Sequence, residues 1–519
     1  MSKYFLLSMI SILTNVSPVL SEDPETSNLK VPFTVSWETT RAVSPVRPEG
    51  TVDYTAALNE ALKGDITPEE NAAVAIVKAI GPNPDNAGYE YHVRLCEALG
   101  VEPLPEDAPG YVEFGTEGYG FIEPAEGSES ENIYDIINDG VLERPWKKEE
   151  LPNAWRWVEL NESVLDQISK AVLLPRYYRP VLLDEEYDNL LIYTPQSELL
   201  ASRSVSRCLL ARAMLRLGEE DYQSAADDLL TLHRFARKIA KGPTMLDVYG
   251  GYSFDYRSQE GDIQLLQLND LPLSILHNYR VQLSELEQSP SVAEKVDLAE
   301  RYMVLQFMQR VATNQLDMET VKKISSSWPD SKPLEYLVYH TDTDWNPIFE
   351  KVNSTFDEAV EVLNKPNLVD RKVAWDHFYN ALNTEKYNPN LERLMTSRRA
   401  ETVSREFIDE ALVKTFVNLL LPFFNNWDQT ERRAQARSEM SLLALKLKEI
   451  QLKEGRYPST LPESTMDPFS GESYMYRVED GEFILYSVGK NRRDDGGFGR
   501  ENDEDPETDD LTVTSRAEK

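Results

Sequence analysis

The sequence predicts a mainly α protein, a multi-helix bundle that ends in a small C-terminal α+β module. Two observations carry this prediction. From about residue 147 to 454, apolar side chains recur at spacings of three and four, which is typical of amphipathic helices. After Glu454 the pattern changes to two runs of aromatic and β-branched residues on either side of Asp480-Gly481, which indicates an antiparallel hairpin.

Composition and charge place the chain among folded, acidic proteins. It has 519 residues, enough for roughly two to four domains, and 41% of them are hydrophobic. This composition excludes collagen-like and wholly disordered classes. With 54 basic and 89 acidic side chains the net charge is -35. Such a polyanion is repelled by phosphate backbones and anionic lipids, so we expect no nucleic-acid partner.

The N-terminus has the pattern of a secretory signal. Lys3 is followed by an apolar run from Tyr4 to Leu13 and then by small residues up to Ser21. We therefore expect a signal peptide at residues 1–21, cleavage after Ser21, and a periplasmic or extracellular location. The apolar run is too short to cross a bilayer. The alternative is a buried N-terminal helix.

The first part of the mature chain divides into three stretches. Residues 22–50 are rich in Pro, Ser and Thr and are expected to be extended. Residues 51–130 form an N-terminal helical subdomain and a long loop, the loop covering 101–130. The subdomain contains a helix from Tyr54, a second from an N-cap at Thr67 to Gly81, and a third at 89–99.

Residues 131–425 are expected to form the helical domain. The pair at 206–218 and 221–240 resembles a hairpin of the tetratricopeptide kind, but no 34-residue period repeats along the chain, so a generic bundle stays open. The apolar stretch 412–424 is interrupted by polar residues and is interpreted as a core helix, so no stable transmembrane anchor is expected. The expected helices are 161–173, 195–217, 219–241, 273–288, 291–315, 346–364, 368–383 and 402–424.

Two cysteines, Cys96 and Cys208, lie far apart in sequence. A disulfide between them and two buried free thiols are both consistent with the sequence, because spacing alone does not give the distance between the two Cα atoms.

The end of the chain contains a series of turn and strand motifs. A long helix ends in a Gly-Arg-Tyr-Pro turn, and an Asp-Pro turn, a hairpin and a Gly- and Asp-rich loop follow. These are the helix 432–452, Gly455-Arg456-Tyr457-Pro458, Asp467-Pro468-Phe469-Ser470-Gly471, Tyr474-Met475-Tyr476 with Leu485-Tyr486-Ser487-Val488-Gly489, and Asp494-Asp495-Gly496-Gly497. In their order and spacing, residues from about 431 to 511 resemble the soluble domain of the major pseudopilin of type II secretion (type II secretion system protein G-like). The remainder resembles uncharacterised bacterial exported proteins.

The resemblance implies a pseudopilin-like module at residues 426–512, followed by a tail at 513–519. In that family the acidic loop binds calcium, and clustered carboxylates on a Gly-rich loop are suitable ligands for this ion. The family's hydrophobic stalk has no counterpart before Arg432, and Asn491-Arg492 replace its Asp-Gly, with Asn491 a candidate neutral ligand. The alternative for the nine acids between 494 and 510 is a solvated acidic tail. The implied calcium ligands are Asp494, Asp495, Asp503, Asp509 and Asp510.

Function is predicted from this module and from the motifs that do not occur. The sequence contains no His-Glu-x-x-His, Cys-x-x-Cys, Gly-x-Ser-x-Gly or Gly-Lys phosphate-loop motif. We therefore expect an exported, noncatalytic interaction or envelope-associated scaffold, with other envelope or secreted proteins as partners. The alternative is an extracellular or periplasmic hydrolase that uses carboxylates in a helical cleft, with aromatic side chains such as Trp155 and Trp157 as sugar platforms.

Overall fold

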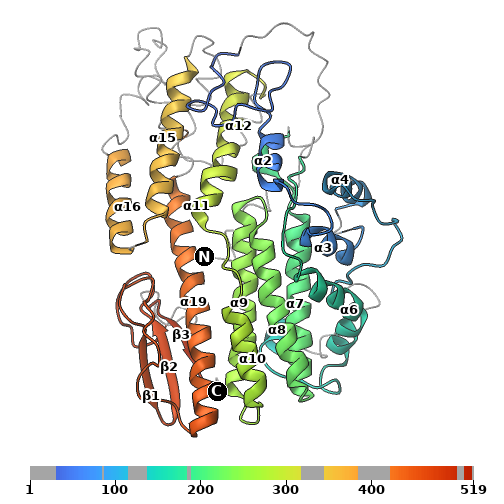
Figure 1. Ribbon diagram of the computed structural model, residues 1–519, viewed down its shortest axis with the longest axis vertical. Coiled ribbons are helices and arrows are strands. Elements are labelled where there is room, and N and C mark those ends of the chain that lie inside the picture. The colour runs from blue at the N-terminus through green and yellow to red at the C-terminus, as the bar shows by residue number, and fades with distance from the viewer. Residues whose placement is uncertain are drawn as a thin grey trace, which may run out of the picture.

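The structure is a computed structural model that describes residues 31–83, 87–114, 137–183, 189–316, 344–366, 368–383, 416, 421–498 and 508–516. It is mainly helical and has a three-stranded antiparallel sheet at the C-terminal end, which confirms the predicted fold class (Figure 1). The predicted signal peptide, residues 1–21, lies outside the described residues.

The helices follow one another with short connections in most of the described chain. The N-terminal part contains α2 (Tyr54–Lys63), α3 (Ala72–Ile80), α4 (Tyr89–Leu99), the π-helix η2 (Ile137–Leu142), α6 (Pro152–Ala171) and the 3₁₀-helix η4 (Leu191–Tyr193). The central part contains α7 (Ser197–Gly218), α8 (Tyr222–Ala240), α9 (Met245–Gln267) and α10 (Leu273–Ser284). The last part contains α11 (Val292–Lys295), the π-helix η5 (Val296–Glu300), α12 (Arg301–Ala312), α15 (Trp345–Leu363), α16 (Leu368–Asn383) and α19 (Leu421–Glu454).

Local signals explain where the N-terminal helices begin and end. The Asp53 side chain caps α2 by accepting a hydrogen bond from the Ala56 amide at 3.0 Å. Gly100 ends α4 in the left-handed conformation, as expected for a helix terminus. The predicted start of the second helix is wrong: Asn71, not Thr67, caps α3, because its carboxamide accepts from the Ala73 amide.

Helices α7 and α8 form the predicted hairpin, and α9 packs against both (Figure 1). Residues 245–267 are not among the helices expected from the sequence. Helix α9 begins with a capping box between Thr244 and Asp247. Its interior glycines lower helix propensity but allow close packing, because a Cβ on Gly251 would lie 2.5 Å from the Cβ of Ala240.

Two large hydrophobic cores lie at opposite ends of the long helices. The first is enclosed by α6 to α10, the C-terminal half of α19 and the sheet, and the second by α2, α11, α12, α15, α16 and the start of α19. Phe424 and Trp427 belong to the second core, whereas Ala436 and Met440 belong to the first. The predicted module boundary at residue 426 therefore falls inside a continuous helix that contributes to both cores.

The described part of the predicted extended segment has no helix or strand, but it is packed onto the protein. Phe33 is buried in the second core, with its ring 5.0 Å from that of Phe349 on α15. Among the described residues, no helix is both long and apolar enough to cross a membrane. Most of the apolar stretch 412–424 is outside the described residues.

The sheet has the order β1 (Met475–Glu479), β2 (Glu482–Ser487) and β3 (Leu511–Thr514). The predicted hairpin joins β1 and β2, and its turn residues Asp480 and Gly481 both have positive φ. Strand β3 was not predicted. It pairs Val513 with Leu485, so the sheet extends past the predicted end of the module at 512. Figure 1 shows the sheet lying against the C-terminal half of α19.

Candidate metal site in the C-terminal module

The acidic loop starts where the chain leaves β2. Gly489 has a φ of 61°, and a Cβ there would lie 2.1 Å from the carbonyl oxygen of Asp509. Only glycine allows this approach. The contact brings the loop that follows β2 onto the segment that precedes β3, although the two are about twenty residues apart in sequence.

Four of the five predicted ligands come together around this crossing. Asp495 Oδ2 accepts hydrogen bonds from the Asn491 Nδ2 group at 2.7 Å and from the Asp509 amide at 3.2 Å. The Asp509 carboxylate accepts from the Asn491 amide at 3.1 and 3.2 Å. Asp494 Oδ1 accepts from the Tyr486 hydroxyl at 2.8 Å. The fifth predicted ligand, Asp503, lies outside the described residues.

Asp510 occupies the most enclosed position of the four. Its Oδ2 atom accepts from the amides of Asp495 and Gly497, at 3.1 and 2.8 Å, whereas its Oδ1 atom is buried without a hydrogen-bond partner. Only 3% of the residue is exposed. Burial raises the pKa of the Asp510 carboxyl to about 6, and the nearby carboxylates of Asp495 and Asp494 raise it further against the two amide hydrogen bonds.

The carboxylate oxygens of the loop that accept no hydrogen bond determine which ion the loop can bind. Among the described residues, no donor bonds to Asp494 Oδ2, Asp495 Oδ1 or Asp510 Oδ1. Three carboxylate oxygens on a Gly-rich loop match the preference of calcium for oxygen ligands, which include backbone carbonyls and water. The described part of the chain has no group of three His, Cys, Asp or Glu side chains already arranged to hold a metal ion. Calcium would therefore have to draw these side chains closer together.

Asn491 has a bracing role in this arrangement. Its side-chain oxygen accepts from the Arg493 amide at 2.7 Å while its Nδ2 group donates to Asp495. Both ends of the carboxamide are thus engaged within the loop, and because a carboxamide oxygen has two lone pairs, the hydrogen bond from Arg493 is compatible with the neutral-ligand role that the sequence suggested.

Two side chains that the sequence analysis did not single out support the loop from the sheet. Arg477 of β1 donates to the Gly496 carbonyl oxygen at 2.9 Å, and its guanidinium lies 5.4 Å from the centre of the Tyr486 ring. Tyr486 in turn holds Asp494. The strand alternation could have revealed them, because register places Arg477 and Tyr486 on the sheet face that points away from α19.

The Asp467-Pro468 turn is fixed to the same end of the sheet. Asp467 is buried and accepts from the Phe469 amide at 2.9 Å, the Ser487 hydroxyl at 2.8 Å and the Val488 amide at 3.2 Å. The predicted turn therefore also determines where β2 ends and the acidic loop begins.

Three buried carboxylates of the helical bundle have arginine partners. Arg212 binds Asp228 at 2.7 Å, Arg179 binds Asp247 at 2.6 Å, and Arg371 binds Asp428 at 2.6 Å. Two of these ion pairs join helices, α7 to α8 and α16 to α19, and the third joins the segment after α6 to α9. A carboxylate committed in this way is poorly placed to act as the acid or base of a hydrolase.

The other features singled out in the sequence also serve packing. Trp157 is buried beside Phe114, and the Trp155 ring is covered by Lys148, whose Nζ lies 3.3 Å from the ring centre. Cys96 and Cys208 are both buried and free, which decides between the two alternatives for the thiols.

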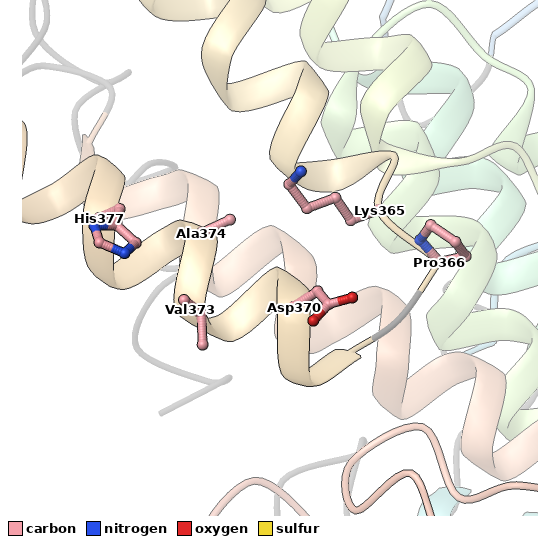
Figure 2. Close-up of a pocket in the computed structure, with 6 residues that line it drawn as sticks. All are labelled: Lys365, Pro366, Asp370, Val373, Ala374 and His377. Carbon is pink, nitrogen blue, oxygen red and sulfur yellow. The ribbon is translucent and has the colours of Figure 1, made fainter.

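Figure 2 shows an open pocket where α15 leads into α16. Asp370 is its one carboxylate, and His377 is exposed at the far side. The Lys365 ammonium lies 3.4 Å from Glu361. The pair of facing carboxyls that the hydrolase alternative requires is absent from this pocket. The lining residues are Lys365, Pro366, Asp370, Val373, Ala374 and His377.

Comparisons of the chain with protein-family models, with curated proteins and with solved structures give no match.

Proposed function

We propose that the chain is an exported, noncatalytic scaffold whose C-terminal pseudopilin-like module binds one calcium ion through its acidic loop. The observation that carries the calcium part is the buried Asp510 oxygen without a hydrogen-bond partner. An unpaired buried carboxylate oxygen is costly, and a bound cation would remove that cost.

The proposed ligands are Asp510, Asp494 and Asp495, with Asp509 holding the loop through the Asn491 amide. Asp503 is a further proposed ligand, which rests on the sequence alone. Calcium would connect the loop that follows β2 to the segment that precedes β3. Both segments would then be held at the same end of β2, the central strand. The ion would thereby stabilise the whole sheet against α19.

The scaffold part is supported by how the module is attached. Helix α19 contributes to both hydrophobic cores, so the module is an integral part of the helical domain and not an appended tail. We propose that the module, held rigidly on α19, binds other envelope or secreted proteins in the periplasm or outside the cell. The arginine partners of Asp228, Asp247 and Asp428 favour this role over the hydrolase.

Thermal unfolding of the full chain in calcium and in chelator tests the ion. Because a ligand stabilises the folded state by mass action, calcium at a hundredfold excess over its Kd adds about 2.7 kcal/mol. The Asp510→Asn variant should lose this gain. Asp480→Asn, a change in the exposed hairpin turn, should keep it. Equal unfolding midpoints with calcium and chelator for the unchanged chain would rule out the calcium site.

Export and partnership need separate measurements. N-terminal sequencing of protein recovered outside the cytoplasm should begin at Glu22, and full-length protein retained in the cytoplasm would contradict export. Cross-linking in intact cells should yield a defined envelope or secreted partner. A chain that cross-links to nothing in that compartment would contradict the scaffold role, whatever the calcium result.

A further inference from the structure

Several arginines buried in the helical bundle reach a carboxylate, whereas Arg257 has no carboxylate within ion-pair distance in the part of the chain that the structure describes. Arg179, Arg212 and Arg301 each have a carboxylate oxygen within 2.6 to 2.7 Å of the guanidinium. Arg257 of α9 is partly buried, and its hydrogen bond among the described residues goes to the neutral Ser206 hydroxyl, at 2.7 Å. In a chain with 89 acidic residues, this lack of a paired carboxylate is unexpected.

The surroundings of Arg257 add positive charge. Ser206 is on α7, and Arg203 and Arg207 flank it on the same helix, one turn apart. We call Arg203, Ser206, Arg207 and Arg257 the arginine cluster. Burial lowers the pKa of Arg257 to about 10, and the charges of Arg207 and Arg203 lower it further, against the opposite effect of Glu260.

We propose that the arginine cluster binds a phosphate group. Guanidinium groups offer planar pairs of N–H donors that match phosphate oxygens, and a hydroxyl supplies a further donor. A dianion would also offset the positive charge that Arg203 and Arg207 place beside Arg257. The site lies between α7 and α9, far in sequence from the acidic loop, so it is independent of the proposed calcium site.

Two tyrosines near the cluster are already engaged with other groups of the protein. The Tyr111 hydroxyl donates to the Ser204 carbonyl oxygen at 2.9 Å, next to Arg203. Tyr256, adjacent to Arg257 on α9, has the Arg437 guanidinium 3.8 Å from its ring centre. The contacts of the cluster suit free phosphate and the phosphate group of a small ester alike, because both present the same oxygens to the guanidinium groups.

Calorimetric titration of the full chain tests the proposal, with inorganic phosphate in one arm and glycerol 3-phosphate in the other. Sodium chloride at equal ionic strength provides the blank. Saturable binding of either compound is expected, and tighter binding of the ester would identify the ester as the ligand. The variants Arg257→Gln and Arg203→Gln should weaken it at least tenfold. Arg203 is exposed, so its replacement should not impair folding.

The control is Arg234→Gln. Arg234 is an arginine of α8 that donates to the Gln282 carboxamide at 3.3 Å, and its loss should leave phosphate binding unchanged. The proposal is overturned if neither compound binds above the chloride blank. It is also overturned if Arg203→Gln and Arg234→Gln weaken binding equally.

Unfolding in phosphate-free buffer gives a second readout. Arg257→Gln should leave the midpoint unchanged or raise it, because the substitution removes charge repulsion. Arg212→Gln should lower the midpoint, since it leaves the buried Asp228 carboxylate without its closest ion-pair partner. If Arg257→Gln lowers the midpoint as much as Arg212→Gln, Arg257 is an ordinary structural residue and the proposal fails.

Discussion

The Arg280 Nε group of α10 donates a hydrogen bond to Glu449 Oε2 of α19 at 2.8 Å. Glu449 is 1% exposed in its side chain, and its other oxygen accepts from His277 at 2.6 Å and from Lys453 at 2.9 Å. This cluster joins the helix that carries the sheet to the helical domain. It lies on α19 six residues before Gly455, and it adds charged contacts to the apolar packing and the Ser441–Asp262 hydrogen bond that also hold α19.

We expect Glu449→Ala to destabilise the protein by about 3 kcal/mol, because it leaves the partly buried Arg280 without its carboxylate. Chemical denaturation monitored by circular dichroism measures this change. Glu454→Ala at the end of the same helix is the control, since Glu454 is exposed. A loss no larger than that of the control would show that the cluster does not fasten the module.

The Glu449 carboxylate should also make the free energy of unfolding depend on pH in the acidic range. Burial raises the pKa of Glu449, but hydrogen bonds from Lys453, His277 and Arg280 outweigh burial and leave it at about 2. The contribution is therefore complete above pH 4.5, the value in the unfolded chain, and is lost as pH falls toward 2. Between pH 5 and 3, the unchanged protein should lose more unfolding free energy than Glu449→Gln. Parallel losses would contradict this prediction.

The ends of most helices lie within a few residues of those predicted from the sequence. Apolar periodicity can be read from a short stretch of sequence without knowledge of the tertiary structure. Helix α16 has the expected bounds, and α7 begins and ends within two residues of expectation. Helix α9 was missed for a physical reason. Gly250 and Gly251 lower helix propensity, and their benefit comes only from tertiary contacts with α7 and α8, which sequence does not display.

We expect Gly251→Ala to destabilise the protein by about 2 kcal/mol, although alanine favours helices more than glycine does. The added methyl group would lie 2.7 Å from the Ala236 carbonyl oxygen, so α8 and α9 would have to move apart. Ser253→Ala, at an exposed position of α9, should be neutral. Thermal unfolding distinguishes the two, and a stabilised Gly251→Ala protein would contradict the close packing.

The candidate metal site was also only partly predictable. The resemblance to the pseudopilin module implied Asp494, Asp495, Asp509 and Asp510 as ligands of one ion. Strand β3 was missed because its four residues are too short a run to show alternation, and its partner strand is more than twenty residues earlier. The shared face of Arg477 and Tyr486 follows from the register of β1 with β2, which the alternation of the predicted hairpin already indicated.

Strand β3 should be required for the stability of the module. Val513 is 9% exposed and faces the first core, whereas the neighbouring Thr512 is exposed. We expect Val513→Ala to cost about 1–2 kcal/mol through lost burial and a small cavity. Thr512→Ala should cost less, since it removes one exposed hydrogen bond to the Gly497 carbonyl oxygen. Hydrogen exchange of the β2 amides would report the difference, and equal exchange in both variants would contradict it.

A buried network around His233 predicts a further dependence on pH. The imidazole lies between two carboxylates, with Nδ1 at 2.8 Å from Asp255 and Nε2 at 3.3 Å from Asp262. Tyr279 and Ser441 donate to Asp262, and Arg237 lies 3.9 Å from Asp255. The network thus ties α8, α9, α10 and α19 together inside the first core.

Burial lowers the pKa of His233, but the carboxylates of Asp262 and Asp255 outweigh burial and raise it to about 9. Because the pKa in the unfolded chain is about 6.5, the stabilisation is complete below that pH and is lost as pH rises through 9. The difference corresponds to about 3 kcal/mol. From pH 6.5 to 9.5 the unchanged protein should lose this much more unfolding free energy than His233→Gln, while His377→Gln, at an exposed position of α16, should follow the unchanged protein. Identical pH profiles for the unchanged protein and His233→Gln would show that the imidazole is neutral in the folded state, so that the two carboxylates must share a proton or draw on other donors.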